Sequence, residues 1–122
     1  MQVAEQNQLG VFPYFALAAG FLTGKYRTRE DIEGTPRAAM TTGYFSDAGL
    51  EVVSALADIA DAHGSAISTV ALAWLLSRNG IVAPIASASR LDQLTSLTDA
   101  PALTLTADEL DRLTALSDKV GE

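Results

Sequence analysis

The chain has 122 residues, a formal net charge of −7 at pH 7 and no cysteine. A chain of this length is expected to form one domain, and its acidity disfavours general binding to nucleic acid or anionic lipid, because both need a basic face. Without cysteine, the chain can form neither disulfides nor thiolate metal ligands. No apolar run is long enough to span a membrane and the N-terminus lacks the pattern of a signal peptide, so we expect a cytoplasmic protein.

Residues 1–8 are polar and helix-permissive, and they predict the end of a helix. Residues 9–14 (LGVFPY) form a short apolar run rich in β-formers, which predicts a buried strand. This strand should end near Tyr14, because Pro13 is tolerated only at strand ends, edges or bulges. Residues 15–46 contain several glycines and predict a long loop with short helical turns. A loop of this length is uncommon in a compact domain unless it has a function.

Two helices are predicted to follow this loop. Ser46 or Asp47 can cap the first, in which apolar residues recur at helical spacing as far as about Ala62. Ser65 can cap the second, which should run to about Arg78 before an Asn-Gly pair ends it. Both helices therefore present an apolar face to a core.

Residues 81–86 (IVAPIA) form a second apolar run and predict a second buried strand. A turn of small residues at 87–89 and a short helix at 90–97 should come next, and Thr106 with Glu109 forms a capping box that opens a last amphipathic helix. Strands that alternate with helices predict parallel pairing and an α/β fold class. Two strands cannot make a stable parallel sheet alone, so the pattern indicates part of a larger fold.

Three spaced segments carry a resemblance to a known family. Residues 13–27 (PYFALAAGFLTGKYR) are similar to the segment after the seventh strand of aldo-keto reductases, and residues 63–94 (HGSAISTVALAWLLSRNGIVAPIASASRLDQL) resemble their helix seven, strand eight and following turn. Residues 35–46 (TPRAAMTTGYFS) match a third family pattern between them. The resemblance implies a (β/α)8 TIM barrel, of which residues 1–122 would be a single, helix-rich C-terminal segment holding strands seven and eight and their helices. Residues 15–46 would then be a long loop facing the cofactor.

Because the family uses NADPH, the resemblance implies a first group of cofactor-binding residues after the first apolar run. Tyr14 would stack on the nicotinamide, and Leu17 and Ala19 would line the diphosphate through their backbone. Lys25 would give a charge to a phosphate, and Arg37 would lie near the diphosphate. A cation that reaches a phosphate forms a charge-assisted hydrogen bond, which is stronger than a neutral one.

The resemblance places a second group of NADP-binding residues after the second apolar run. Ser87 begins a turn that faces the adenosine 2′-phosphate in the family. Ser89 and Arg90 would donate hydrogen bonds to that phosphate, and Gln93 lies one helical turn further on. Ser87 replaces the family's usual glycine and Leu97 replaces the asparagine that reads adenine, so the adenine end should bind more weakly by about 1–2 kcal/mol.

Each of these residues also has a simpler interpretation. Tyr14 can be a core aromatic at a strand end, Lys25 and Arg37 can be solvated surface cations, and residues 87–89 can be only the first turn of a helix. His63 precedes a glycine at a helix end, where an imidazole meets the last carbonyls, and is interpreted as structural. A single histidine without cysteine disfavours a zinc site, so no metal is expected.

Two functions of different classes remain open. In the first, the chain is the C-terminal NADPH-binding portion of an aldo-keto reductase, which reduces aldehydes or ketones by hydride transfer. The family's catalytic Asp, Tyr, Lys and His lie on earlier strands, so the chain by itself lacks them and is expected to be inactive. In the second, the chain is a truncated, non-catalytic module that self-associates or completes another chain's barrel, because bare strand edges favour such pairing. The expected partners are the cofactor and an N-terminal barrel half or a second copy, with no nucleic acid and no membrane.

Overall fold

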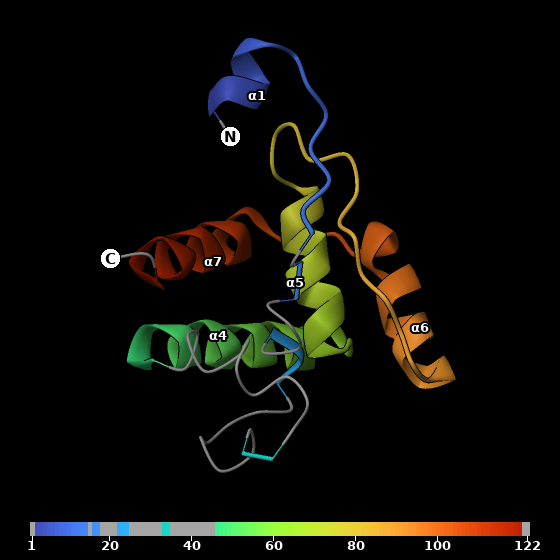
Figure 1. Ribbon diagram of the computed structural model, residues 1–122. Coiled ribbons are helices and arrows are strands. Elements are labelled where there is room, and N and C mark those ends of the chain that lie inside the picture. The colour runs from blue at the N-terminus through green and yellow to red at the C-terminus, as the bar shows by residue number, and fades with distance from the viewer. Residues whose placement is uncertain (1, 15, 18–21, 25–32, 35–45, 121–122) are drawn as a thin grey trace.

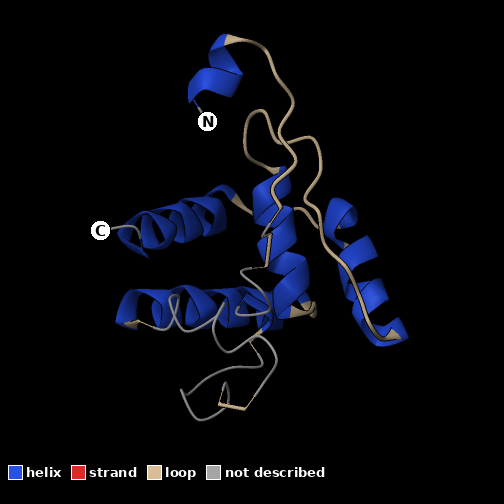
Figure 2. Ribbon diagram, in the orientation of Figure 1, coloured by secondary structure: helices blue, strands red, loops and turns tan. Residues whose placement is uncertain are grey.

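A computed structural model describes residues 2–14, 16–17, 22–24, 33–34 and 46–120 of the chain (Figure 1). Helices dominate this part of the chain, and Figure 2 shows no strand in it. The elements in chain order are α1 (Gln2–Gln6), α4 (Asp47–His63), α5 (Ile67–Leu76), α6 (Leu91–Thr98), the 3-10 helix η3 (Ala100–Ala102) and α7 (Ala107–Val120).

The two apolar runs pair in parallel, as predicted, but the pairing is short. Val11 and Ile81 form an isolated parallel bridge. The Val11 N–H donates to the carbonyl of Gly80 at 2.8 Å, and the Val11 carbonyl accepts from the Val82 N–H at 2.9 Å. The parallel direction is therefore confirmed, whereas the two predicted strands do not form in the described residues.

The prediction that both runs are buried is also wrong for the described residues. Phe12 is 56% and Tyr14 is 72% exposed, and Val82 and Ile85 on the second run are exposed as well. Parallel strands become buried only when other strands and helices cover both faces, and two strands alone make a marginal ribbon. Pro13 also removes a backbone donor from the first run.

Helix α4 begins where the sequence predicts. The Oγ of Ser46 accepts from the Gly49 N–H at 3.0 Å, which satisfies one of the unpaired donors of the first turn. The helix ends at Gly64, whose φ of 63° lies in the left-handed region that favours glycine. The side chains of Val53, Leu56 and Ile59 recur at helical spacing and are buried, so one face of α4 packs into the core.

Helix α5 is the central helix, and it lies between α4 and α6 (Figure 1). Consecutive residues from Thr69 to Ala73 are all buried, as expected for a helix surrounded by neighbours. The predicted cap at Ser65 is wrong: the helix starts after Ala66, which makes no side-chain capping bond. The helix also ends at Leu76 rather than at Arg78.

Two buried clusters hold the helices together. The larger one joins α4, α5 and α7 and includes Leu56, Ile59, Val70 and Leu113. The smaller one consists of the buried Ala16, Leu72 and Ala100, against which the partly buried Leu17, Leu75, Leu76 and Leu97 pack. Helix α6 contributes to this smaller cluster but has no fully buried residue of its own.

The capping box that opens α7 is confirmed. The Thr106 N–H donates to a carboxylate oxygen of Glu109 at 2.9 Å, and the Glu109 N–H donates to the hydroxyl of Thr106 at 3.2 Å.

Among the described residues, none of the single helices is long and apolar enough to cross a membrane. Only when taken together are helices α4 and α5 long and apolar enough for a membrane span, and the pair is bent by 99° at its junction.

Candidate cofactor-binding site

The segments that follow the two apolar runs start side by side. The Ile85 N–H donates to the carbonyl of Pro13 at 2.9 Å, so the ends of the runs are joined. Tyr14 comes directly after Pro13, and Ser87 comes two residues after Ile85. The blue and yellow-orange runs in Figure 1 follow this pairing toward the same end. Residues of both predicted cofactor-binding groups therefore begin at one end of the paired runs.

The smaller cluster links the same two segments to α5. Leu17, from the first predicted group, packs against this cluster and also against the larger one. Leu97, on α6, packs against the same buried residues. Apolar side chains on both sides thus hold the start of the first segment and the helix after the second segment on one face of α5.

Ser89 and Gln93 form a closed turn at the start of α6. The side-chain carbonyl of Gln93 accepts from the Ser89 N–H at 3.0 Å and from the Ser89 hydroxyl at 3.1 Å. Two donors of Ser89 that could bind an anion are therefore directed at an amide oxygen. A phosphate that binds to Ser89 would have to replace this oxygen, which costs little because the contact is exposed to water.

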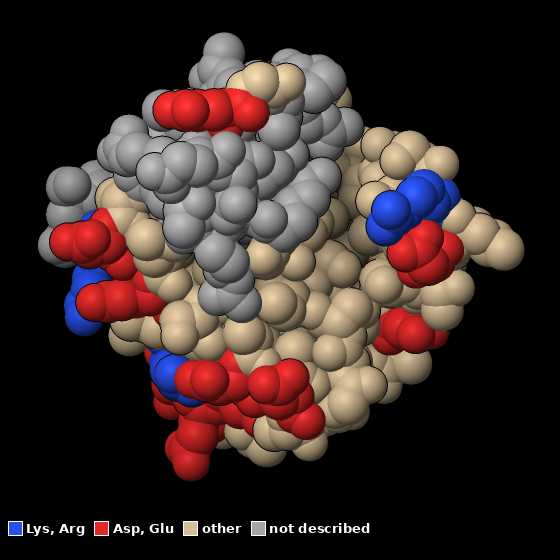
Figure 3. All heavy atoms as spheres, turned by 90° about the horizontal axis from the view of Figure 1, so that it is seen from below, with Lys and Arg blue, Asp and Glu red and all other residues tan. Residues whose placement is uncertain are grey.

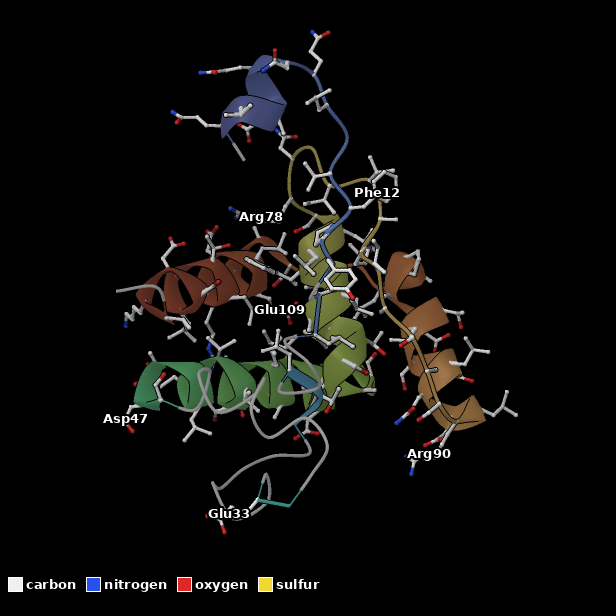
Figure 4. All side chains as sticks on the ribbon, viewed as in Figure 1. Phe12, Glu33, Asp47, Arg78, Arg90 and Glu109 are labelled. Atoms are coloured by element: carbon white, nitrogen blue, oxygen red, sulfur yellow. The ribbon has the colours of Figure 1, made fainter. Side chains whose placement is uncertain are left out.

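Arg90 comes next and pairs with Asp92. Its guanidinium lies 3.1 Å from the carboxylate, and both side chains are exposed. Figure 3 shows basic side chains lying against acidic ones, and Figure 4 shows Arg90 at the outer tip of α6. An exposed ion pair contributes only about 0–1 kcal/mol, so the guanidinium can be transferred to a phosphate at small cost.

The remaining predicted residues divide into two sets. Tyr14 is exposed, which contradicts its interpretation as a core aromatic, and Ser87 is also exposed. The predicted contacts of Ala19, Lys25 and Arg37 lie outside the described residues, as does most of the 15–46 loop.

Two residues on α5 belong to this arrangement although no sequence pattern indicated them. Thr69 is only 2% exposed, and its hydroxyl donates to the backbone carbonyl of Ser96 on α6 at 2.6 Å. Leu72, one helical turn later, is a buried member of the smaller cluster. A threonine inside an apolar helix is a weak signal, because its hydroxyl often bonds to its own helix instead.

His63 contacts a carboxylate. Its Nε2 lies 2.9 Å from both carboxylate oxygens of Glu109 and so joins the end of α4 to the start of α7. The Thr106 N–H that donates to Glu109 lowers the pKa of this carboxyl, and the hydrogen bond and charge of His63 lower it further against the opposing effect of burial. Glu109 belongs to the first turn of α7 and is labelled in Figure 4. This contact joins α4 to α7, which supports a structural role for His63, but its partner is the Glu109 carboxylate and not the last carbonyls of α4 that the sequence suggested.

Trp74 makes a second bridge to α7. Its Nε1–H donates to the hydroxyl of Thr114 at 3.1 Å, and the guanidinium of Arg78 lies 5.2 Å from the centre of its ring.

In the part of the chain that the structure describes, no three His, Cys, Asp or Glu residues gather as they would for a metal ion.

An open hollow of about 470 Å³ lies at the other end of the paired runs. Residues of α1, of the 8–10 segment and of the 79–82 segment line it, and they include the polar side chains of Glu5, Gln8 and Asn79. Of the predicted cofactor-binding residues that the structure describes, none lines this hollow.

The chain matches a known protein family along nearly its whole length. The family model described as "Aldo/keto reductase family" aligns with residues 1–118. The chain is 29% identical over 100 residues to L-glyceraldehyde 3-phosphate reductase of Escherichia coli K12, an alignment that covers 77% of this chain and 29% of the relative. It is 31% identical over 100 residues to aldo-keto reductase yakc [NADP(+)] of Schizosaccharomyces pombe, covering 77% of this chain and 28% of that relative.

The chain thus spans less than a third of the length of these curated relatives. The family match includes both apolar runs, the segments after them, helices α4 to α6 and most of α7. By this match, the chain belongs to the aldo/keto reductase family.

Proposed function

We propose that this chain supplies the C-terminal, NADP-binding part of an aldo/keto reductase. Membership of the family implies a (β/α)8 barrel, and the short coverage of the relatives supports the interpretation of residues 1–122 as one segment with strands seven and eight. The name of the yeast relative, which includes NADP(+), supports the choice of cofactor. The parent reaction is hydride transfer from NADPH to an aldehyde or ketone, in which the cofactor supplies the hydride and the protein binds and orients it. The catalytic Asp, Tyr, Lys and His of the family would come from outside this chain.

The observation that carries the proposal is the hydrogen bond between Ile85 and Pro13, which joins the ends of the two runs. Because this bond brings the ends of the two runs together, it supports the proposal that one ligand contacts both the segment after the first run and the segment after the second. Exposed Tyr14 would offer its ring to the nicotinamide, and Leu17, whose side chain packs against both buried clusters, would line the diphosphate through its backbone. In the same proposal, the loop of residues 15–46 would face the cofactor, with the backbone of Ala19 at the diphosphate and the charge of Lys25 at a phosphate.

On the other side, the residues around the start of α6 would bind the adenosine 2′-phosphate. Ser87 would open the turn, and Ser89 would donate its N–H and hydroxyl after Gln93 releases them. Arg90 would exchange Asp92 for the phosphate. Arg37, which the structure does not describe, is proposed to lie near the diphosphate.

Replacement of Arg90 by glutamine tests this assignment. Because NADPH carries the 2′-phosphate and NADH does not, we expect the Kd for NADPH to rise about tenfold, as for the loss of one charged hydrogen bond, and the Kd for NADH to stay unchanged. Titration of the purified chain with each nucleotide by calorimetry measures both constants.

Arg112→Gln is the matched control for this titration. Arg112 pairs with Asp58 at 2.8 Å between α7 and α4, and both side chains are exposed. The change in charge is the same, so this variant should bind both nucleotides like the wild type. Equal losses for NADPH and NADH, or a wild-type chain that binds neither, would contradict the proposed function.

A second candidate function is a non-catalytic module that self-associates or completes another chain's barrel. It is favoured by the exposed apolar side chains on the paired runs, which include Leu9, Phe12 and Val82. The backbone groups of Val11 face the second run, so those of Phe12 face the opposite edge, because successive residues of an extended chain alternate in direction. That edge is a template for a further strand.

Light scattering on the purified chain tests self-association. If the second function holds, the wild type should exceed the monomer mass in a concentration-dependent way, and Phe12→Ser should shift it toward the monomer by removing apolar contact area. Val120→Ser, at the end of α7, is the control and should keep the wild-type mass. A monomeric wild type at all concentrations would speak against self-association.

A further inference from the structure

Helix α6 depends on its neighbours for its position. It has only eight residues, and none of them is fully buried. The hydroxyls of Thr95 and Ser96 bond back to backbone carbonyls of their own helix at 3.5 Å and 3.3 Å, and such residues are poor helix formers. Helices of this length are marginal in water by themselves. The place of α6 is therefore set by what contacts it.

The contact with the most definite geometry comes from Thr69 on α5. Its side chain is 2% exposed, and its hydroxyl donates to the Ser96 carbonyl at 2.6 Å. Ser96 lies in the last turn of α6, where backbone carbonyls have no donor from within the helix. A buried hydroxyl and a helix-end carbonyl satisfy each other here, and separating them would leave the buried hydroxyl of Thr69 without this acceptor, at a cost in stability.

Leu72 lies one helical turn after Thr69 on the same helix. It belongs to the buried cluster against which Leu17 and Leu97 pack. Leu17 comes from the segment after the first run, and Leu97 neighbours Ser96 on α6. One face of α5 therefore holds both sides of the proposed cofactor site, by apolar packing at Leu72 and by a directed hydrogen bond at Thr69.

We propose that Thr69 is a positioning residue for the 2′-phosphate end of the cofactor. This inference rests on the proposed function. The Thr69 hydroxyl fixes the last turn of α6, and the helix, about 12 Å long, carries that constraint to Ser89, Arg90 and Gln93 at its other end. Thr69 itself does not contact the cofactor; it acts through the placement of α6.

The test compares Thr69→Val, which keeps the shape of the side chain without the hydroxyl, with Thr69→Ser, which keeps the hydroxyl. Amide hydrogen exchange over residues 89–98 and the Kd values for NADPH and NADH are measured on the full chain. We expect Thr69→Val to speed exchange in α6 and to weaken NADPH binding about fivefold while NADH changes little. Thr69→Ser should restore slow exchange and the preference for NADPH. Thr69→Ala replaces the valine variant if that variant does not fold.

The outcomes separate this inference from the proposed function. Unchanged exchange and an unchanged NADPH preference in Thr69→Val would overturn the inference while the proposed function stands. Equal behaviour of the serine and valine variants would also overturn it, because the hydroxyl would then not be the cause. A purely structural role would lower both affinities together or only the thermal midpoint. A wild-type chain that binds neither nucleotide refutes the proposed function and with it the cofactor role of Thr69.

Discussion

Replacing Leu113 by alanine is expected to lower the free energy of unfolding by about 2–5 kcal/mol. Leu113 is 2% exposed and is the fully buried side chain of α7. It belongs to the cluster that joins α4, α5 and α7, where the lost methyl groups would leave a cavity. Urea unfolding followed by far-UV circular dichroism measures the change, as a lower midpoint at an unchanged slope.

Leu91→Ala is the control for this measurement. Leu91 is 80% exposed at the start of α6, so the same truncation there removes little buried area. Its effect should stay within about 0.5 kcal/mol. Equal losses for Leu113→Ala and Leu91→Ala would show that α7 does not pack on the core as described.

Replacing Glu109 by glutamine is expected to remove an acid-sensitive part of the stability. The pKa of Glu109 is lowered from its usual 4.5, chiefly by the hydrogen bond from the Thr106 N–H and then by His63. A carboxyl whose pKa is lower in the folded state stabilises the fold fully above its unfolded pKa, and this contribution is lost as the pH falls through the folded pKa. The wild type should therefore lose stability below about pH 5, and the variant should lose less over the same range.

Glutamine keeps an acceptor for the capping box, so this substitution isolates the charge from the cap. Urea midpoints measured at several pH values between about 3 and 7 give the comparison. Glu51→Gln, which removes one exposed carboxylate from α4, controls for the change in net charge. If the two variants follow the same pH dependence, the contacts of Glu109 with Thr106 and His63 do not carry the effect.

Helix boundaries were predictable where the signal is local. The Ser46 cap and the Thr106–Glu109 box both join residues three positions apart, so neighbouring letters contain the whole interaction. The start of α5 was not predictable in this way. The structure has Ala66 rather than Ser65 at the cap position, and the helix begins at the apolar residue Ile67, which packs against the larger cluster. The residues at this boundary are not themselves fully buried, since complete burial begins only at Thr69.

The assignment of the candidate site rests on family resemblance alone and stays a prediction. Neither composition nor periodicity assigns Tyr14 or Arg90 to a cofactor, and the simpler sequence interpretation of Tyr14, a core aromatic, was wrong because its side chain is exposed. The bond from Thr69 to Ser96 spans 27 positions, and no pattern in the sequence specifies such a partner. Contacts of this kind depend on how helices pack, which is a property of the whole fold.

By itself, the sequence determined the family, the order of helices and apolar runs, and the two capped helix starts, because these depend on residue identity and on neighbours along the chain. Only the tertiary structure decided how far the apolar runs pair, which side chains they leave exposed, and which face of α5 holds the segments after both runs. The physical reason is that a side chain is buried, or finds a long-range hydrogen-bond partner, only when segments distant in the sequence pack against it. The contribution of each residue to the fold therefore depends on which side chains those segments place next to it.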